Sequence, residues 1–124
     1  MNKALNDLIE LGTTRKEIDA FGKKWKMHTL DSKDQLEVTN STSEYDTLSR
    51  VIALKVGIMA RAVDSVDGQS IGNNSEKREI FGKLPIPVIN YLYDQYELLL
   101  NIQNETLENL SKPSEDKKEK NIAV

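Results

Sequence analysis

The hydrophobic pattern of the chain is densest between residues 44 and 68, where apolar side chains recur with the spacing of a helix. The stripe follows the 3.6-residue helical period and consists of Leu48, Val51, Ile52, Val56, Met59, Val63 and Val66. Leu54 and Ile58 widen it, so the pattern predicts a central helix buried on two sides. The capping pattern Ser43-x-x-Asp46 is expected to start this helix, and Asp67-Gly68 is a turn signal at its end.

Residues 15–30 alternate between polar and apolar positions instead, which is typical of a strand. One orientation is shared by Trp25, Met27 and Thr29, and the opposite one by Lys26 and His28. This pattern predicts a β-hairpin that turns at Gly22. The competing interpretation is a helical turn starting at Thr14, because Thr14-x-x-Glu17 fits a capping box.

Two further amphipathic helices are predicted, one near each end of the chain. Residues 2–11 carry Leu5, Leu8 and Ile9 on one helical face, and so short a helix must dock this face on the core or on a partner. After Pro87, a helix of about 35 Å is expected to run from residue 88 to about 110. Its stripe consists of Ile89, Leu92, Tyr93, Tyr96, Leu99, Leu100, Leu107 and Leu110. Because this length matches the width of such a domain, its far end is expected to overhang and offer a docking surface.

Shorter elements fill the remaining chain. Ser32-x-x-Gln35 opens a short segment before a polar loop at 39–43, and residues 69–72 form a short extended piece. Asn73-Asn74 is suited to cap a helix over 75–82. Together the elements predict an α+β, mostly helical fold in which an N-terminal β-hairpin packs on the central buried helix and the long C-terminal helix.

The length of 124 residues favours one compact domain, which we place at residues 1–112. Residues 113–124 have too little apolar content to fold alone, which predicts a flexible charged tail. The alternative for this tail is that Ile122-Ala123-Val124 forms an apolar hook that docks on a partner.

The charge and composition of the chain argue against several classes of function. The chain has 17 basic and 20 acidic residues, a net charge of -3 with the signs interspersed, which argues against binding nucleic acid. No stretch has the apolar length of a membrane span, so no membrane partner is expected. Cysteine is absent, which excludes disulfides and thiolate metal sites and favours a reducing cytoplasm.

The residues that carry chemistry form no recognisable catalytic or metal pattern. His28 is the only histidine, and one imidazole with carboxylates is a rare zinc ligand set. Asp64 and Asp67 do not fit a calcium loop, because Gly68 at its sixth position would put Val63 at the first. Phosphate-binding glycine motifs and a nucleophile elbow are also absent. We therefore expect no enzyme activity, no cofactor and no metal site.

The order of elements resembles the tail assembly chaperones and baseplate-hub assembly proteins of tailed bacteriophages. The resemblance covers residues 15–110. Its N-terminal part is Ile18-x-x-Phe21-Gly22-Lys23-Lys24-Trp25-x-Met27, entering Leu30-Asp31, and then the helix over 45–63 with its exit Val66-Asp67-Gly68. Its C-terminal part is Leu84-Pro85 leading to Val88-Ile89-x-x-Leu92-Tyr93-x-x-Tyr96-x-x-Leu99.

The resemblance implies a non-catalytic role in tail morphogenesis: binding a tape-measure, hub or baseplate component as an assembly chaperone, in the host cytoplasm. Some of these proteins carry a frameshift extension or a second chaperone domain, and neither is recognised in these residues, so a structural baseplate or tail subunit retained in the virion stays an alternative. A homo-oligomer is also open. The expected partner-binding residues are on the hairpin and the long helix: Phe21, Trp25, Met27, Tyr93, Tyr96, Leu99, Leu100 and Leu107.

Overall fold

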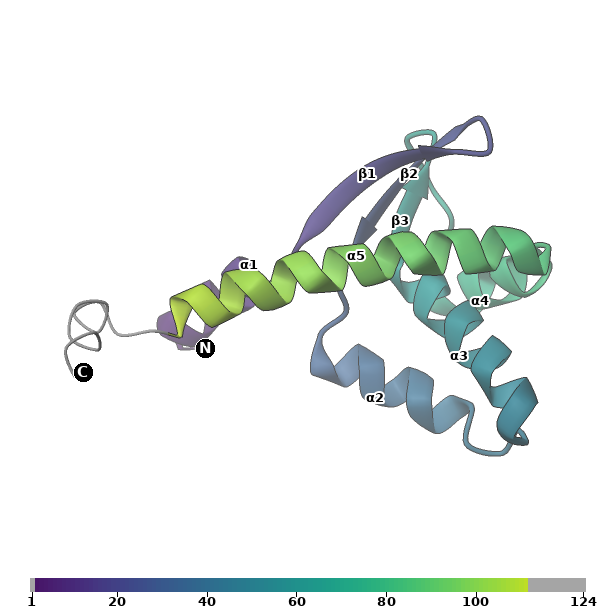
Figure 1. Cartoon of the computed structure of the whole chain (residues 1–124), viewed down its shortest axis with the longest axis horizontal. Coiled ribbons are helices and arrows are strands. Elements are labelled where there is room, and N and C mark those ends of the chain that lie inside the picture. The colour runs from purple at the N-terminus through teal and green to yellow at the C-terminus, as the bar shows by residue number, and fades with distance from the viewer. Residues whose placement is uncertain (1, 112–124) are drawn as a thin grey trace, which may run out of the picture.

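The computed structural model describes residues 2–111, which fold into helices packed against one small sheet (Figure 1). The helices are α1 (Lys3–Gly12), α2 (Ser32–Ser41), α3 (Thr47–Ala62), α4 (Asn74–Gly82) and α5 (Ile86–Leu110). The strands are β1 (Arg15–Ala20), β2 (Lys23–His28), β3 (Val63–Val66) and β4 (Gln69–Ser70). The predicted α+β, mostly helical fold with an N-terminal hairpin and a long C-terminal helix is confirmed.

The β1–β2 hairpin forms where the alternating pattern predicts it. The strands pair antiparallel, with Ile18 opposite Trp25. The two turn residues, Phe21 (φ 55°) and Gly22 (φ 74°), both lie in the left-handed region, which is the turn geometry that matches the twist of paired strands. Thr14 precedes a strand, so the competing helical turn is wrong.

The predicted central helix is too long at its C-terminal end. It ends at Ala62, and Val63–Val66 forms β3, which pairs antiparallel with β2. Valines at both ends of a four-residue segment fit a helical stripe and a strand equally well, but the branched side chains favour the strand. Asp67 (φ 52°) and Gly68 (φ 81°) then make a second two-residue turn into β4. The sheet order is β1-β2-β3-β4.

The N-terminal half of α3 is also less buried than the stripe predicts. Its cap is Asp46, whose carboxylate accepts a hydrogen bond from the Ser49 N–H at 2.9 Å, and not Ser43. The buried residues of α3 all lie in its second half: Gly57, Ile58, Met59, Ala60 and Ala62. Leu48, in the first turn, is 81% exposed. Two-sided burial is therefore wrong for the first half of the helix.

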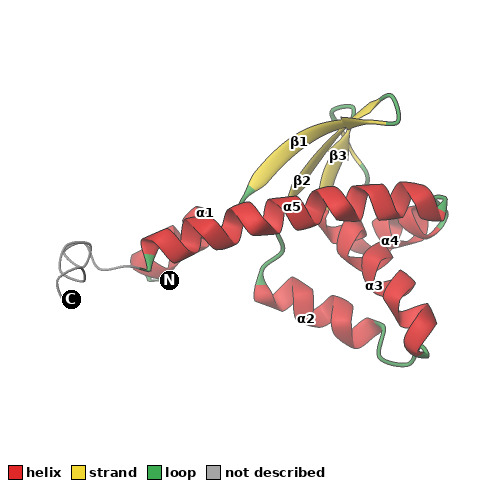
Figure 2. Ribbon diagram, in the orientation of Figure 1, coloured by secondary structure: helices red, strands yellow, loops and turns green. Residues whose placement is uncertain are grey.

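The core lies where the sheet meets α3, α4 and α5. The Trp25 indole meets the ring of Phe81 edge to face at 6.5 Å, and its N–H donates to the Ala20 carbonyl at 2.9 Å. Leu92 and Tyr96 of α5 are also buried in this core. In Figure 2 the strands rise on one side of α5, while α2 and the first half of α3 lie on the other.

The far end of α5 extends beyond the sheet, and α1 lies beside it (Figure 1). The Gln103 amide donates hydrogen bonds to the Gly12 carbonyl and to the Thr29 hydroxyl. No residue of α1 is buried, and its apolar stripe of Leu5, Leu8 and Ile9 stays about half exposed. The predicted tail at 113–124, with its hook Ile122-Ala123-Val124, lies outside the described residues.

A candidate protein-binding groove

Four of the predicted partner-binding residues lie in the core. Trp25, Met27, Tyr96 and Leu99 are 6%, 1%, 2% and 1% exposed. Side chains buried to this extent have no surface to offer a partner in this conformation, so their assignment as contact residues is corrected to core packing. Their apolar spacing reflected burial within the chain itself, which sequence periodicity does not distinguish from burial at an interface.

The other four are more accessible, but the structure does not bring them together into one surface. Phe21 is 53% exposed at the hairpin turn, where its ring meets that of Tyr91 edge to face at 5.5 Å. Tyr93 and Leu100 are half-buried on α5 beside the core. Leu107 is half-buried at the far end of α5, with its side chain beside Gly12.

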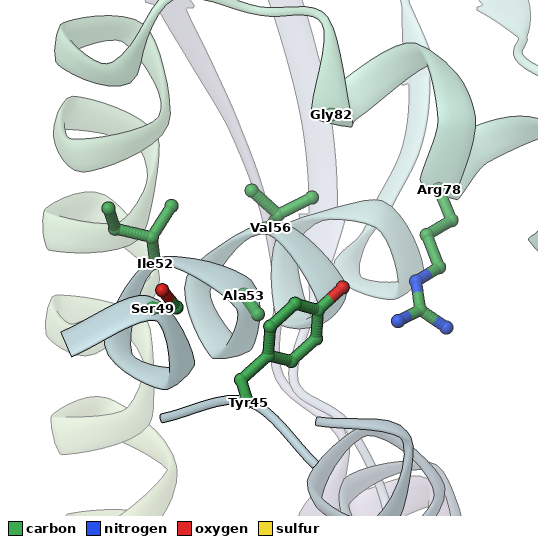
Figure 3. Close-up of a pocket in the computed structure, with 7 residues that line it drawn as sticks. All are labelled: Tyr45, Ser49, Ile52, Ala53, Val56, Arg78 and Gly82. Atoms are coloured by element: carbon green, nitrogen blue, oxygen red, sulfur yellow. The ribbon is translucent and has the colours of Figure 1, made fainter. Parts of the chain in front are cut away.

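A continuous apolar groove lies instead along the exposed first half of α3. Two adjoining cavities of about 430 and 240 Å³ make it up and share Ile52, Val56 and Gly82. The first is walled by α3 and α4 and by Tyr45 of the preceding loop, as Figure 3 shows. The second lies between α3 and the start of α5. The remaining lining residues are Ser49, Val51, Ala53, Lys55, Arg78, Leu84, Ile86, Ile89 and Asn90.

Several apolar side chains along the groove are exposed to solvent. Val51 and Ile52 are 50% and 45% exposed on α3, and Ile86 is 53% exposed at the start of α5. Single exposed apolar residues are ordinary, but a contiguous group beside a cavity marks an interaction site. None of these residues was among the predicted contacts.

Arg50 fixes the loop that forms one end of the groove. Its guanidinium donates to the carbonyl oxygens of Thr42 (3.2 Å), Ser43 (2.7 Å) and Tyr45 (3.1 Å). Three bonds from one planar group hold the loop between α2 and α3 against the first turn of α3. As a result, the Tyr45 ring is held at the groove mouth, beside Ala53 (Figure 3).

Lys55 joins the other wall of the groove to α5. Its ammonium donates to the Asn90 side-chain oxygen at 3.2 Å and lies 5.4 Å from the centre of the Tyr93 ring. A cation over an aromatic face is attracted by the ring quadrupole. The contact therefore links the middle of α3 to the first turns of α5 beside the second cavity.

The charged side chains that line the groove are all basic. Lys55 and Arg78 are lining residues, and no aspartate or glutamate lines either cavity. Serine and tyrosine hydroxyls are present at Ser49 and Tyr45, but no histidine, carboxylate or thiol lies among the lining residues to activate them. These side chains offer apolar contact with a cationic rim.

Some of the charged groups outside the groove form ion pairs within residues 2–111. His28 Nδ1 lies 2.8 Å from an Asp64 oxygen, and Arg61 pairs with both Asp34 (2.8 Å) and Glu37 (2.7 Å). Within the described residues, no group of three or more His, Asp or Glu side chains is placed to hold a metal ion. The helices of this part of the chain also include none that is long and apolar enough to cross a membrane.

No protein-family model matches the chain, and no curated protein or solved structure matches it. The assignment of function therefore rests on the geometry of the α3 groove and on the motifs of residues 15–110.

Proposed function

We propose that this chain is a non-catalytic protein-binding subunit whose α3 groove takes up the apolar face of an amphipathic helix from another protein. The observation that carries the proposal is the exposed first half of α3, where Val51 and Ile52 face a groove that no described element covers. Helix-in-groove binding uses an apolar channel of this kind, filled by side chains at helical spacing.

The rim of the groove favours an acidic ligand. Arg78 lines the first cavity and Lys55 lines the second, and both would pair with carboxylates that flank the apolar stripe of a bound helix. Rim charges of this type contribute mainly to selection and association rate, while the apolar floor supplies the affinity.

The resemblance to phage tail assembly proteins gives the class of ligand. Under this proposal the chain acts in tail morphogenesis and binds a helical segment of a tape-measure, hub or baseplate protein as an assembly chaperone in the host cytoplasm. A carrier for such a segment covers apolar surface until assembly and needs no catalytic group. The second candidate, a structural subunit kept in the virion, uses the same groove permanently.

A binding assay with groove variants tests the proposal. Labelled peptides from tape-measure, hub and baseplate proteins of the same genome are titrated with wild-type protein, Ile52→Glu and the control Leu36→Glu. Leu36 is 61% exposed on α2 and does not line the groove. We expect Ile52→Glu to weaken binding at least tenfold and Leu36→Glu to leave it unchanged.

Equal binding by Ile52→Glu and wild type would contradict the groove as the binding site. Binding by none of the tail-protein peptides would contradict the class of partner. Mass spectrometry of purified virions then separates the two roles, because an assembly chaperone is missing from the particle and a structural subunit is present in it.

A further inference from the structure

Helix α1 presents a second unpartnered apolar surface, of the opposite shape to the groove. Leu5, Leu8 and Ile9 form a convex stripe and are 56%, 52% and 51% exposed. The last residue of α1, Gly12, lies against α5: the Leu107 side chain is 3.6 Å from the position of a Cβ on Gly12, and the Gln103 amide donates to the Gly12 carbonyl. The first two turns of α1 therefore keep their apolar face available to another molecule.

The polar face of α1 is acidic. Asp7 and Glu10 outnumber Lys3, which pairs with Asp7 at 3.4 Å. Glu105 and Glu108 add negative charge on the neighbouring end of α5. An acidic amphipathic helix is the ligand that an apolar groove rimmed by Lys55 and Arg78 favours.

The chain cannot place α1 in its own groove without leaving this fold. Ile89 lines the groove near the start of α5, while Leu107 meets α1 near its end. Eighteen residues separate them, which at ~1.5 Å per residue is about 27 Å of straight helix. In Figure 1, α1 lies at one end of α5, and α3 and α4 lie at the other. The α1 that fills a groove must therefore belong to another copy.

We propose that α1 of one copy docks in the α3 groove of the next, so that the protein associates with itself head to tail. Such a contact uses two different surfaces of each copy, and it continues into a ring if the rotation closes or into an open chain if it does not. In this state the groove is occupied by α1, and an amphipathic segment of a partner has to displace it. Self-association then regulates access to the site of the proposed function.

Mixing two complementary variants tests the proposal. Ile52→Glu damages the groove and leaves α1 intact, while Leu8→Glu damages the stripe and leaves the groove intact. We expect wild-type protein to show concentration-dependent oligomers by light scattering after size exclusion, and each variant alone to be a monomer. An equimolar mixture should form a 1:1 heterodimer, because one undamaged groove still meets one undamaged stripe.

Other patterns overturn the proposal. A monomeric wild type up to millimolar concentration does so directly. Oligomers that survive in Ile52→Glu but not in Leu8→Glu indicate a symmetric contact between α1 surfaces, and the reverse indicates a symmetric contact between grooves. Both variants are checked by circular dichroism, and the control Leu36→Glu should keep the wild-type mass. If Leu8→Glu unfolds α1, Leu5→Gln and Ile9→Gln replace it as milder stripe variants.

The inference shares the groove with the proposed function, but the two fail separately. Loss of all self-association leaves peptide binding by the groove to be measured in the same samples. Failure of every tail-protein peptide to bind leaves the heterodimer test unaffected. If both are right, a bound peptide should shift wild-type oligomers toward the monomer.

Discussion

The hydroxyl oxygen of Tyr96 accepts a hydrogen bond from the backbone N–H of Leu30 across 3.0 Å, inside the core. Tyr96 lies in the middle of α5, and Leu30 lies in the link between β2 and α2. Both residues are buried, at 2% and 9% exposure. This one bond attaches the long helix to the end of the hairpin, 66 residues away in the sequence.

Tyr96→Phe removes this acceptor and leaves the ring in place. The Leu30 N–H then lies buried without the Tyr96 oxygen, which is expected to cost about 1–3 kcal/mol of unfolding free energy. Urea denaturation followed by circular dichroism measures the change. Tyr91→Phe is the control, because Tyr91 is 43% exposed and its hydroxyl makes no recorded bond among the described residues. A Tyr96→Phe protein as stable as wild type would contradict a stabilising role for the bond.

The same tyrosine predicts a loss of stability at alkaline pH. Burial raises the pKa of Tyr96, partly offset by its bond to Leu30, and burial also raises the pKa of Tyr93. A tyrosine whose pKa is higher when folded keeps its proton longer in the folded state, so stability is full below the unfolded pKa of about 10 and falls as pH rises above it. Melting temperatures measured between pH 8 and 11 should fall less steeply in Tyr96→Phe than in wild type. Parallel slopes would be inconsistent with this explanation.

The sequence predicted those parts of the fold in which local chemistry and packing agree. The alternating pattern and Gly22 identified the hairpin, and Asn73 caps α4 with a full capping box to Glu76. Strand β3 was missed, because Val63 and Val66 satisfy the period of the preceding helix. What decides its conformation is pairing with β2, a contact between residues about 40 positions apart that no local pattern contains.

The groove was missed for a related reason. Val51 and Ile52 belong to the same apolar stripe as Met59, and only the folded structure shows that the second half of α3 is buried and the first half is open. The opposite holds for Trp25 and Tyr96, which were expected to contact a partner but are buried in the core. Periodicity locates apolar faces, while the topology decides which of them remain exposed.

Lys77 is a buried lysine. It is 8% exposed on α4, one turn before Phe81, and among residues 2–111 its side chain has no recorded hydrogen bond or ion pair. Burial lowers the pKa of this lysine, partly offset by Asp64. The charged form is therefore disfavoured by folding, and Lys77→Met is expected to raise the melting temperature at pH 7.

The sign of the pH dependence checks the cause. Because the folded pKa of Lys77 is depressed, its unfavourable contribution is full below the folded pKa and disappears as pH rises past the unfolded value of about 10.4. The advantage of Lys77→Met over wild type should therefore shrink between pH 7 and 11. Lys33→Met, at an exposed position on α2, is the control for the effect of the substitution type itself. A destabilised Lys77→Met protein would contradict the prediction.

Gly57 sets the distance between α2 and α3. A Cβ at this position would lie 2.9 Å from Cγ1 of Val38, a buried and stiff side chain. Alanine gains about 1 kcal/mol in helix propensity, but a forced contact in a packed core costs about 1–3 kcal/mol, so Gly57→Ala should be net destabilising by roughly 1 kcal/mol. The double variant with Val38→Ala should remove the clash, and a thermodynamic cycle over the four proteins measures the coupling. Additive effects would mean that the two residues do not meet.

The hydrogen bonds from Arg50 to the loop between α2 and α3 hold one end of the groove in place before a ligand binds. Arg50→Ala removes the three bonds to the carbonyls of Thr42, Ser43 and Tyr45, so we expect faster amide hydrogen exchange in residues 43–46 and little change in the core. Lys83→Ala is the matched control, since its 3.9 Å pair with Glu79 is exposed and weak. A ligand that meets a loosened loop must also order it, and this ordering lowers affinity without removing any contact of the ligand itself. Arg50→Ala should therefore weaken every occupant of the groove several-fold, whether a peptide or α1 of another copy, and unchanged exchange in residues 43–46 would exclude this role.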